Sequence, residues 1–221
     1  MQGHRHAIGA DGPFAFGWYR RAETGELSGV ILAGGKSRRM GRDKSHLILG
    51  GETLVARAAR TLSALSDDVV VVANTLEPRG NLAARLTGDV IAGGGALSGI
   101  HAGLAAARHE FALVVACDMP FLNLALLRHM ASLAPGHDAV VPHWQGESEP
   151  LHAIYSRQCI TVIEPVLRRG GGRIVELYAT IRVRYLEMEE IARFDPEGLS
   201  FFNINSPDDW ERAQELAVRK G

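Results

Sequence analysis

Cysteine is scarce in this sequence, and long uncharged apolar runs are missing from it. Cys117 and Cys159 are the two cysteines among 221 residues, so a disulfide framework is not expected and a reducing, cytoplasmic compartment is favoured. A membrane helix needs about 18 or more consecutive apolar residues, and the sequence has no such run. These absences predict a cytoplasmic protein that makes no membrane contact.

A large net charge of either sign is missing as well. The 24 Lys and Arg residues almost balance the 25 Asp and Glu residues, and the formal net charge is -1. A nucleic-acid-binding domain typically carries a clear positive excess, so no nucleic-acid partner is expected. The positive charge is instead concentrated locally, because five cations crowd into residues 36–44.

Two nucleotide-binding fingerprints are also absent. A P-loop needs a glycine five positions before the glycine of its Gly-Lys-Ser end, and the residue at that position before Gly35 is Val30. The glycines of residues 93–99 do not have the G-x-G-x-x-G spacing of a dinucleotide-binding turn. Neither a P-loop enzyme nor a dinucleotide-binding protein is therefore indicated.

The first 26 residues differ from the rest of the chain. They show neither helical nor strand periodicity, and the Arg20-Arg21 pair is not followed by the apolar stretch of a twin-arginine export signal. We expect residues 1–26 to form a flexible N-terminal tail or extension. Residues 27–221 are expected to form a single domain, since no internal repeat or low-complexity linker interrupts them.

From Gly29 onward, apolar runs typical of buried strands alternate with segments of helical spacing. Strands are predicted at 29–34, 67–74, 89–93, 111–118, 138–144, 150–156 and 200–205, and helices at 53–65, 97–109, 122–133 and 207–220. This alternation implies right-handed crossovers. The fold class that it predicts is α/β, with three α/β/α layers and a mostly parallel Rossmann-like sheet.

The stretch "ILAGGKSRRMGRDK", residues 31–44, lies at the carboxyl end of the first predicted strand. Gly34 and Gly35 allow backbone N–H groups to come close to an anion. Arg39 and Lys44, with the neighbouring cations, add side chains that bind phosphate. Ligands of open α/β sheets bind at this edge. The loop suits a polyphosphate ligand, and the alternative is an ordinary solvated basic loop.

Polar residues end two later segments. Asp118 closes the apolar run of residues 111–117 and faces the same sheet edge as the glycine loop. It suits a hard cation such as Mg²⁺, which one or two carboxylates and phosphate oxygens hold, or it forms a turn. Asn203 and Asn205 alternate onto one face, where they suit either a ligand or an Asx turn before the last helix.

Three stretches together, "LAGGKSRRMGRDK", "CDMPFL" and "FFNINSPDDW", resemble the molybdenum cofactor guanylyltransferases, a family of α/β nucleotidyltransferases. The resemblance runs from about residue 29 to residue 210. It implies a nucleotidyltransferase-type fold and transfer of GMP from GTP to the terminal phosphate of the molybdenum cofactor (molybdopterin). It also implies Mg²⁺, loss of pyrophosphate and transient contact with molybdoenzyme maturation proteins.

The resemblance also implies roles for single residues. The residues that it places at the nucleotide are Leu32, Ala33, Gly34, Gly35, Lys44, Asn74, Asp89 and Asp118. Lys44, Arg39 and Asp118 would be catalytic, with Asp118 holding Mg²⁺. The residues that it places on the pterin side are Glu149, Arg173, Asn203 and Asn205. One departure is Ala96, which stands where the family has proline in the loop after Asp89.

Three alternatives stay open. The first is a cytidylyltransferase that uses CTP, although such relatives tend to have Ala-Ala-Gly where this chain has Ala33-Gly34-Gly35. The second is a sugar-phosphate nucleotidyltransferase. The third is a non-catalytic nucleotide-binding or assembly protein, and the presence of Lys44 and Asp118 argues against it.

Overall fold

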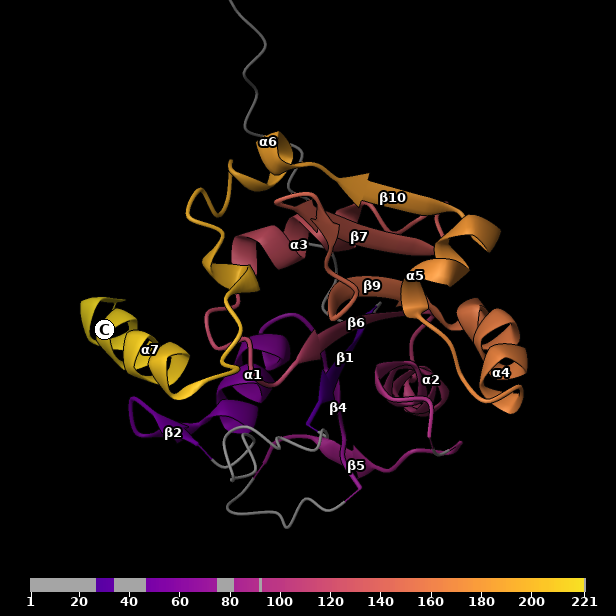
Figure 1. Ribbon diagram of the computed structural model, residues 1–221, viewed down its shortest axis with the longest axis horizontal. Coiled ribbons are helices and arrows are strands. Elements are labelled where there is room, and N and C mark those ends of the chain that lie inside the picture. The colour runs from indigo at the N-terminus through magenta and orange to yellow at the C-terminus, as the bar shows by residue number, and fades with distance from the viewer. Residues whose placement is uncertain (1–26, 34–46, 75–81, 92, 221) are drawn as a thin grey trace, which may run out of the picture.

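The computed structural model describes residues 27–33, 47–74, 82–91 and 93–220. An eight-stranded sheet runs through them in the order β10-β7-β9-β6-β1-β4-β5, with β8 paired to β7 (Figure 1). The strands are β1 (Leu27–Leu32), β4 (Asp68–Val72), β5 (Arg85–Thr87), β6 (Phe111–Ala116), β7 (Ala139–Trp144), β8 (Glu147–Ser148), β9 (His152–Ser156) and β10 (Val183–Leu186), and β2 (Ile48–Leu49) and β3 (Glu52–Thr53) form a separate hairpin.

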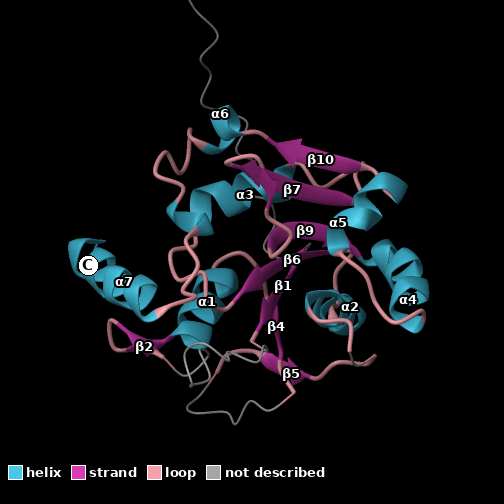
Figure 2. Ribbon diagram, viewed as in Figure 1, coloured by secondary structure: helices cyan, strands magenta, loops and turns pink. Residues whose placement is uncertain are grey.

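Helices cover both faces of this sheet (Figure 2). They are α1 (Leu54–Ser63), α2 (Ala96–Ala106), α3 (Leu124–Ser132), α4 (Ile160–Arg168), α5 (Ile174–Leu177), α6 (Met188–Ile191) and α7 (Pro207–Lys220). One apolar core joins α1 and α3 to the sheet, and a second joins α2 and α4 to its other face. The predicted three-layer α/β/α fold with a mostly parallel sheet is therefore confirmed.

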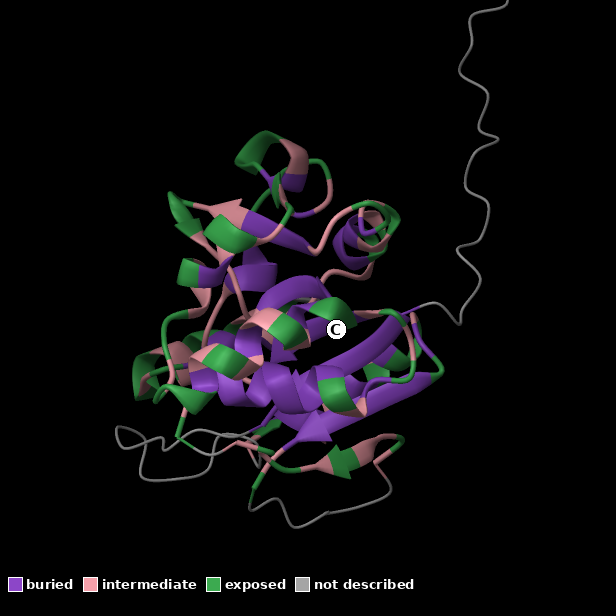
Figure 3. Ribbon diagram, turned by 90° about the vertical axis from the view of Figure 1, so that its right-hand side faces the viewer, coloured by how far each residue is buried: buried purple, intermediate pink, exposed green. Residues whose placement is uncertain are grey.

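Three parallel strands, β6, β1 and β4, form the centre of the sheet, and their residues are almost entirely buried (Figure 3). β9 is antiparallel to both β6 and β7. Buried on both faces, a central strand needs an unbroken apolar run, and the valines at 69–72 meet that need. Among the described residues, no helix is long and apolar enough to cross a membrane.

Two glycines in α2 explain how this helix approaches β1. Glycine in a helix costs about 1 kcal/mol relative to alanine. A Cβ at Gly99 would lie 3.2 Å from Leu32 Cδ2, and a Cβ at Gly103 would overlap the Val30 side chain. The missing side chains therefore allow α2 to pack closely on β1, and the buried contact offsets the cost of the glycines.

The predicted start of the last helix is confirmed. Ser206 and Asp209 form a reciprocal capping box, in which the Asp209 N–H donates to Ser206 Oγ at 3.2 Å and the Ser206 N–H donates to Asp209 Oδ2 at 2.9 Å. Such a box satisfies N–H groups that have no partner within the helix. The cap fixes where α7 begins, directly after the Asn203–Asn205 segment.

Two predicted strands are wrong. Residues 89–93 do not form a strand, and the strand in this part of the chain is β5 at Arg85–Thr87, a short half-exposed edge strand without the apolar run that signals burial. Residues 200–205 begin with a 3-10 turn at Leu199–Phe201 and continue without strand pairing. Gly198, at φ 63°, turns the chain there.

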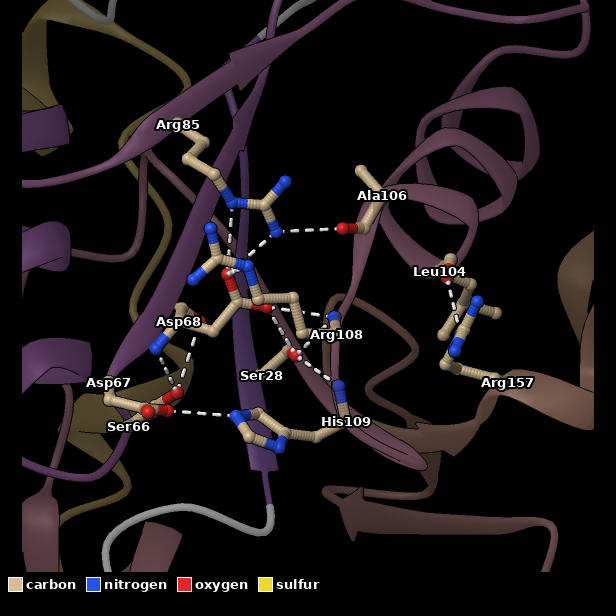
Figure 4. A network of polar contacts seen from close by, with 10 residues as sticks. All are labelled: Ser28, Ser66, Asp67, Asp68, Arg85, Leu104, Ala106, Arg108, His109 and Arg157. Atoms are coloured by element: carbon tan, nitrogen blue, oxygen red, sulfur yellow. Dashed lines mark hydrogen bonds and ion pairs between the residues drawn. The ribbon is translucent and has the colours of Figure 1, made fainter.

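A buried carboxylate joins four elements at the amino edge of the sheet (Figure 4). Asp68 Oδ2 accepts from Ser28 Oγ at 2.7 Å and from the Arg108 N–H at 2.9 Å, and Asp68 Oδ1 accepts from Arg85 Nη2 at 2.6 Å. Arg85 Nη2 also donates to the carbonyl of Ala106 at 2.7 Å, at the end of α2. The carboxylate is almost fully buried, with a side-chain exposure of 1%, and is fully hydrogen-bonded, as a buried charge must be.

These contacts predict a large stability loss in Asp68→Asn. Hydrogen bonds to a charged group contribute about 1.5–3 kcal/mol, and water partly compensates the Arg85 side chain, which is 40% exposed. We therefore expect a decrease of about 2 kcal/mol in the free energy of unfolding, measured by urea denaturation at pH 7. The matched control is Asp67→Asn, since Asp67 is exposed and its partner is His109. A control loss equal to that of Asp68→Asn would contradict the prediction.

The contacts of Asp68 also predict that the stability of the protein depends on pH. Burial alone would raise the pKa of Asp68, but hydrogen bonds from Ser28, Arg108 and Arg85 outweigh it and lower the pKa. The stability that Asp68 contributes is present above its unfolded pKa of about 4 and is lost as the pH falls through the lowered folded pKa. The wild-type protein should therefore lose stability more steeply below pH 4 than Asp68→Asn.

Candidate active site

Backbone hydrogen bonds align the carboxyl ends of the central strands. The Ala33 N–H donates to the Val72 carbonyl at 3.0 Å, and the Cys117 N–H donates to the Leu32 carbonyl at 3.1 Å. The Ala73 N–H donates to the Thr87 carbonyl at 2.9 Å and extends the alignment to β5. Residues that follow these strands therefore lie along one edge, where α/β sheets bind ligands.

Asn74 and Asp89, which follow β4 and β5, form a hydrogen-bonded pair at this edge. Asn74 Nδ2 donates to Asp89 Oδ2 at 2.9 Å, and the Asp89 N–H donates to Asn74 Oδ1 at 2.8 Å. A Cβ at Gly88 would lie 3.1 Å from Asn74 Oδ1, so the absence of a side chain at Gly88 leaves space for the Asn74 side-chain amide. The two predicted nucleotide residues are thus brought together, and each fixes the orientation of the other.

Asp118 follows β6 at the same edge and is partly exposed. Its backbone carbonyl accepts from the Ile204 N–H at 3.0 Å, which joins the segment after β6 to the segment before α7. Asn203 and Asn205 flank Ile204, and Asn203 Nδ2 donates to the carbonyl of Phe201 at 3.3 Å. The structure therefore brings the segment of both asparagines to the neighbourhood of Asp118, although no strand carries them.

Leu32 and Ala33 are buried at the end of β1, and the Leu32 carbonyl and the Ala33 N–H are bonded to the neighbouring strands. Ala33 is the last described residue before the glycine loop. The predicted residues Gly34, Gly35, Arg39 and Lys44 lie outside the described residues.

Two glycine turns meet beside this edge. A Cβ at Gly171 would lie 3.3 Å from Gly94 Cα, and the Gly94 N–H donates to Ser98 Oγ at 2.9 Å in the first turn of α2. Arg173, exposed, follows the second turn and directly precedes α5. The loop that carries Arg173 therefore touches the loop that begins α2, which links the predicted pterin side to the predicted nucleotide side.

Glu149 lies at the other end of the predicted pterin side, between β8 and β9. Its N–H donates to the Pro142 carbonyl at 2.9 Å. Burial, with a smaller contribution from the Glu147 carboxylate, raises the pKa of Glu149. No described contact joins Glu149 to Arg173 or to Asp118, so its role on the pterin side stays a prediction.

Asp118 has the chemistry that a hard cation requires. Among the described residues, no three His, Cys, Asp or Glu side chains gather to form a complete metal site. Mg²⁺ rarely needs such a cage, because one or two carboxylates, substrate phosphates and water complete its octahedral shell. A single partly exposed carboxylate at the ligand-binding edge fits this type of site. Cys117, the preceding residue, is buried in the core beside α1, as strand alternation predicts.

His152 was not found by sequence reasoning, because nothing in its apolar surroundings distinguishes it from a core residue. It is fully buried on β9, where it pairs with Val115 near the end of β6. Neither ring nitrogen has a hydrogen-bond partner among the described residues. Its ring lies 5.0 Å from that of Phe201, which stacks on Trp144 at 5.4 Å.

Comparison with known proteins gives one consistent family. A model of the MobA-like NTP transferase domain matches residues 29–183. A probable molybdenum cofactor guanylyltransferase of Pelotomaculum thermopropionicum is 40% identical over 192 residues, which cover 87% of this chain and 94% of that protein. The molybdenum cofactor guanylyltransferase of Desulfosudis oleivorans is 41% identical over 197 residues, covering 88% and 97%.

Solved structures agree with this comparison. The molybdopterin-guanine dinucleotide biosynthesis protein A of Archaeoglobus fulgidus superposes with a TM-score of 0.76 at 30% identity, covering 87% of this chain and 99% of that one. The 2-C-methyl-D-erythritol 4-phosphate cytidylyltransferase of Thermus thermophilus shares the fold, with a TM-score of 0.67 at 20% identity over 87% and 99% of the two chains.

The buried imidazole predicts a pH-dependent stability. Burial lowers the pKa of His152 to about 4, against an opposing contribution from the Asp195 carboxylate. The unfolded chain binds a proton near pH 6.5, so stability is full above that pH and falls as the pH drops toward 4. Between pH 7.5 and pH 5 the loss from this group should be about 2 kcal/mol.

The measurement is urea denaturation of the wild type and His152→Leu at both pH values. His152→Leu should lack this part of the pH dependence, so the difference between the two proteins isolates the group from all other titrations. Equal pH dependence in the two proteins would show that His152 does not titrate in this range.

Proposed function

The chain belongs to the MobA-like NTP transferase family, whose named relatives are nucleotidyltransferase enzymes, and we propose that it transfers GMP from GTP to molybdopterin. The donor is GTP, the acceptor is the terminal phosphate of the molybdenum cofactor, and the products are pyrophosphate and the guanine dinucleotide form of the cofactor. Delivery of this product to molybdoenzyme maturation proteins, in the cytoplasm, belongs to the same proposal.

The observation that supports the proposal most is the meeting of three polar groups at one sheet edge. The Asn74–Asp89 pair, the carboxylate of Asp118 and the segment of Asn203 come from four separate parts of the chain. Their placement along one edge suits a long substrate pair, with the nucleotide over β1, β4 and β5 and the acceptor near the segment before α7. The identity of the substrates is inferred from the names of relatives that are about 40% identical over most of the chain.

The reaction requires charge neutralisation more than a strong base. An acceptor phosphate oxygen attacks the α-phosphorus of GTP, the bond from that phosphorus to the bridging oxygen breaks, and pyrophosphate leaves. The attacking phosphate is already ionised, so orientation and electrostatic stabilisation carry most of the catalysis. Bound Mg²⁺ would neutralise phosphate charge, and Asp118 would hold it. Leu32, Ala33, Asn74 and Asp89 would hold the nucleoside, and Arg39 and Lys44 would bind its phosphates.

The alternatives differ in what supports them. The cytidylyltransferase of T. thermophilus is only 20% identical, and that likeness supports a shared fold alone. No comparison given above favours a sugar-phosphate acceptor. A non-catalytic assembly protein would bind GTP without turnover. A turnover assay with GTP, Mg²⁺ and purified molybdenum cofactor therefore tests the proposal, and absence of pyrophosphate and dinucleotide product would refute it.

Replacement of Asp118 by Asn should reduce kcat by at least about a hundredfold, because the amide cannot supply the charge that holds the cation. GTP binding should persist, since base and ribose contacts lie on other elements. Asp138→Asn is the matched control: Asp138 precedes β7 at the opposite edge and pairs with Arg182. A wild-type kcat in Asp118→Asn would show that Asp118 only forms a turn and does not act in catalysis.

GTP should be preferred over CTP and ATP by at least about a hundredfold in kcat/KM. A site built to hydrogen-bond its ligand rejects analogues that leave buried polar groups unpaired. Guanine offers an acceptor at O6 and donors at N1 and N2, which the backbone near Leu32 and Ala33 and the Asn74 side chain could complement. A competition assay with all three nucleotides measures the ratio. Equal or better use of CTP would favour the cytidylyl alternative.

A further inference from the structure

The segment between α6 and α7 has two faces that serve different parts of the fold. Phe202 and Ile204 turn toward α7, where Phe202 lies 5.9 Å from Phe121 between ring centroids. Phe201 turns the other way, into the core that α1 and α3 share with the sheet. The Asn203 side chain bonds to the Phe201 backbone, so the position of Phe201 determines where the Asn203 amide lies at the edge of the site.

Phe201 is held between two rings. Trp144 stacks on it at 5.4 Å with an interplanar angle of 27°, and His152 meets it edge-on at 5.0 Å with an angle of 64°. Edge-on aromatic pairs favour one orientation because the polarised ring edge is attracted to the electron-rich face. The Phe201 carbonyl in turn accepts from Asn203 Nδ2 at 3.3 Å. This bond fixes the rotation of the Asn203 amide and directs its oxygen away from Phe201.

The choice of histidine at position 152 is costly for stability. A buried polar group without a hydrogen bond destabilises the folded state, and both ring nitrogens of His152 lack a partner among the described residues. Ile154 occupies the same face of β9 two residues later and is equally buried. The core on this face of β9 therefore accommodates apolar side chains, and burial alone does not call for a histidine. A residue that breaks the local rule beside a candidate site is a candidate for function.

We propose that His152 is a positioning residue for guanylyl transfer, which holds Phe201 and through the Phe201 carbonyl aims the Asn203 amide at the acceptor. This inference rests on the proposed function, since it assigns a role to a residue beneath that site. His152 itself touches neither substrate. It acts through Phe201 and Asn203, so its replacement should lower kcat/KM for the pterin acceptor and leave GTP binding unchanged.

The surrounding contacts separate this role from a general role in folding. Asp195 accepts from the Leu199 N–H at 3.2 Å and from the Ser200 N–H at 2.7 Å, and Ser200 Oγ accepts from the Asn123 N–H at 3.2 Å. These bonds hold the turn before Phe201 without His152. Loss of the imidazole should therefore leave the segment folded but allow the Phe201 ring, and with it Asn203, to move.

The experiment compares the wild type with four purified variants in the turnover assay with GTP, Mg²⁺ and molybdenum cofactor. His152→Leu keeps a similar volume and removes the unpartnered nitrogens. It should be at least as stable as the wild type at pH 7.5, yet its kcat/KM for the acceptor should fall by about tenfold, a size typical of coupled contacting residues. Its KM for GTP should change by less than about twofold.

Ile154→Ala is the matched control, because it opens the same core from the same strand and leaves the His152–Phe201 ring pair in place. It should lose stability and keep the acceptor kcat/KM of the wild type. Phe201→Leu, alone and combined with His152→Leu, completes a double-mutant cycle. If His152 acts through Phe201, the second substitution should add less than about twofold to the effect of the first.

The outcomes separate the two proposals. If the wild type does not form the dinucleotide, the proposed function is wrong. If the wild type is active and His152→Leu has the wild-type acceptor kcat/KM, the positioning role is wrong. An equal fall for both substrates, or additive effects of the His152 and Phe201 substitutions, would also overturn it.

Discussion

The hydrogen-bond ladder between β1 and its parallel neighbours is the constraint on which the candidate site depends. Leu32 pairs with Val72 on one side and with Ala116 on the other, so the three strands end at the same level. A slip of one residue would turn every side chain of a strand to the opposite face. The buried Ser28–Asp68 contact opposes such a slip, because these two residues are partners in the register and are bonded at 2.7 Å. The amino edge thus secures the alignment that the carboxyl edge uses.

The glycines of the chain serve this geometry in two ways. Gly99 and Gly103 allow α2 to lie close to β1, so the beginning of α2 comes to the same edge as the ends of the strands. The turns at 93–95 and 170–172 then touch through Gly94 and Gly171. Close backbone packing, which any side chain would prevent, therefore connects the helix layer to the loop that carries Arg173.

The sequence predicted the elements that are buried and regular. β1, β4 and β6 are continuous apolar runs, and α7 has a complete capping signal, so local chemistry alone identifies them. The same logic placed Asp118 at the edge of the glycine loop, because carboxyl ends of parallel strands share it, whereas Asn74 and Asp89 were implied by the family resemblance alone. It failed at β5, whose pairing depends on the neighbouring β4 rather than on its own apolar pattern. It also failed for residues 200–205, where the contacts of Phe201 and Ile204 with distant elements, not alternation, determine the path.

His152 marks the limit of such reasoning, since burial is a property of the whole fold. Two of the buried titratable groups, Asp68 and His152, lie at opposite edges of the sheet and differ in their hydrogen bonds. Asp68 has every hydrogen bond that a buried charge needs, and its contacts stabilise the strand register. His152 has none among the described residues and must stay neutral to stay buried, so its position lowers stability. That cost lies next to the segment of Asn203. The amino edge therefore stabilises the fold through Asp68, whereas at the carboxyl edge, under the proposed role of His152, a loss of stability accompanies the positioning of a site residue.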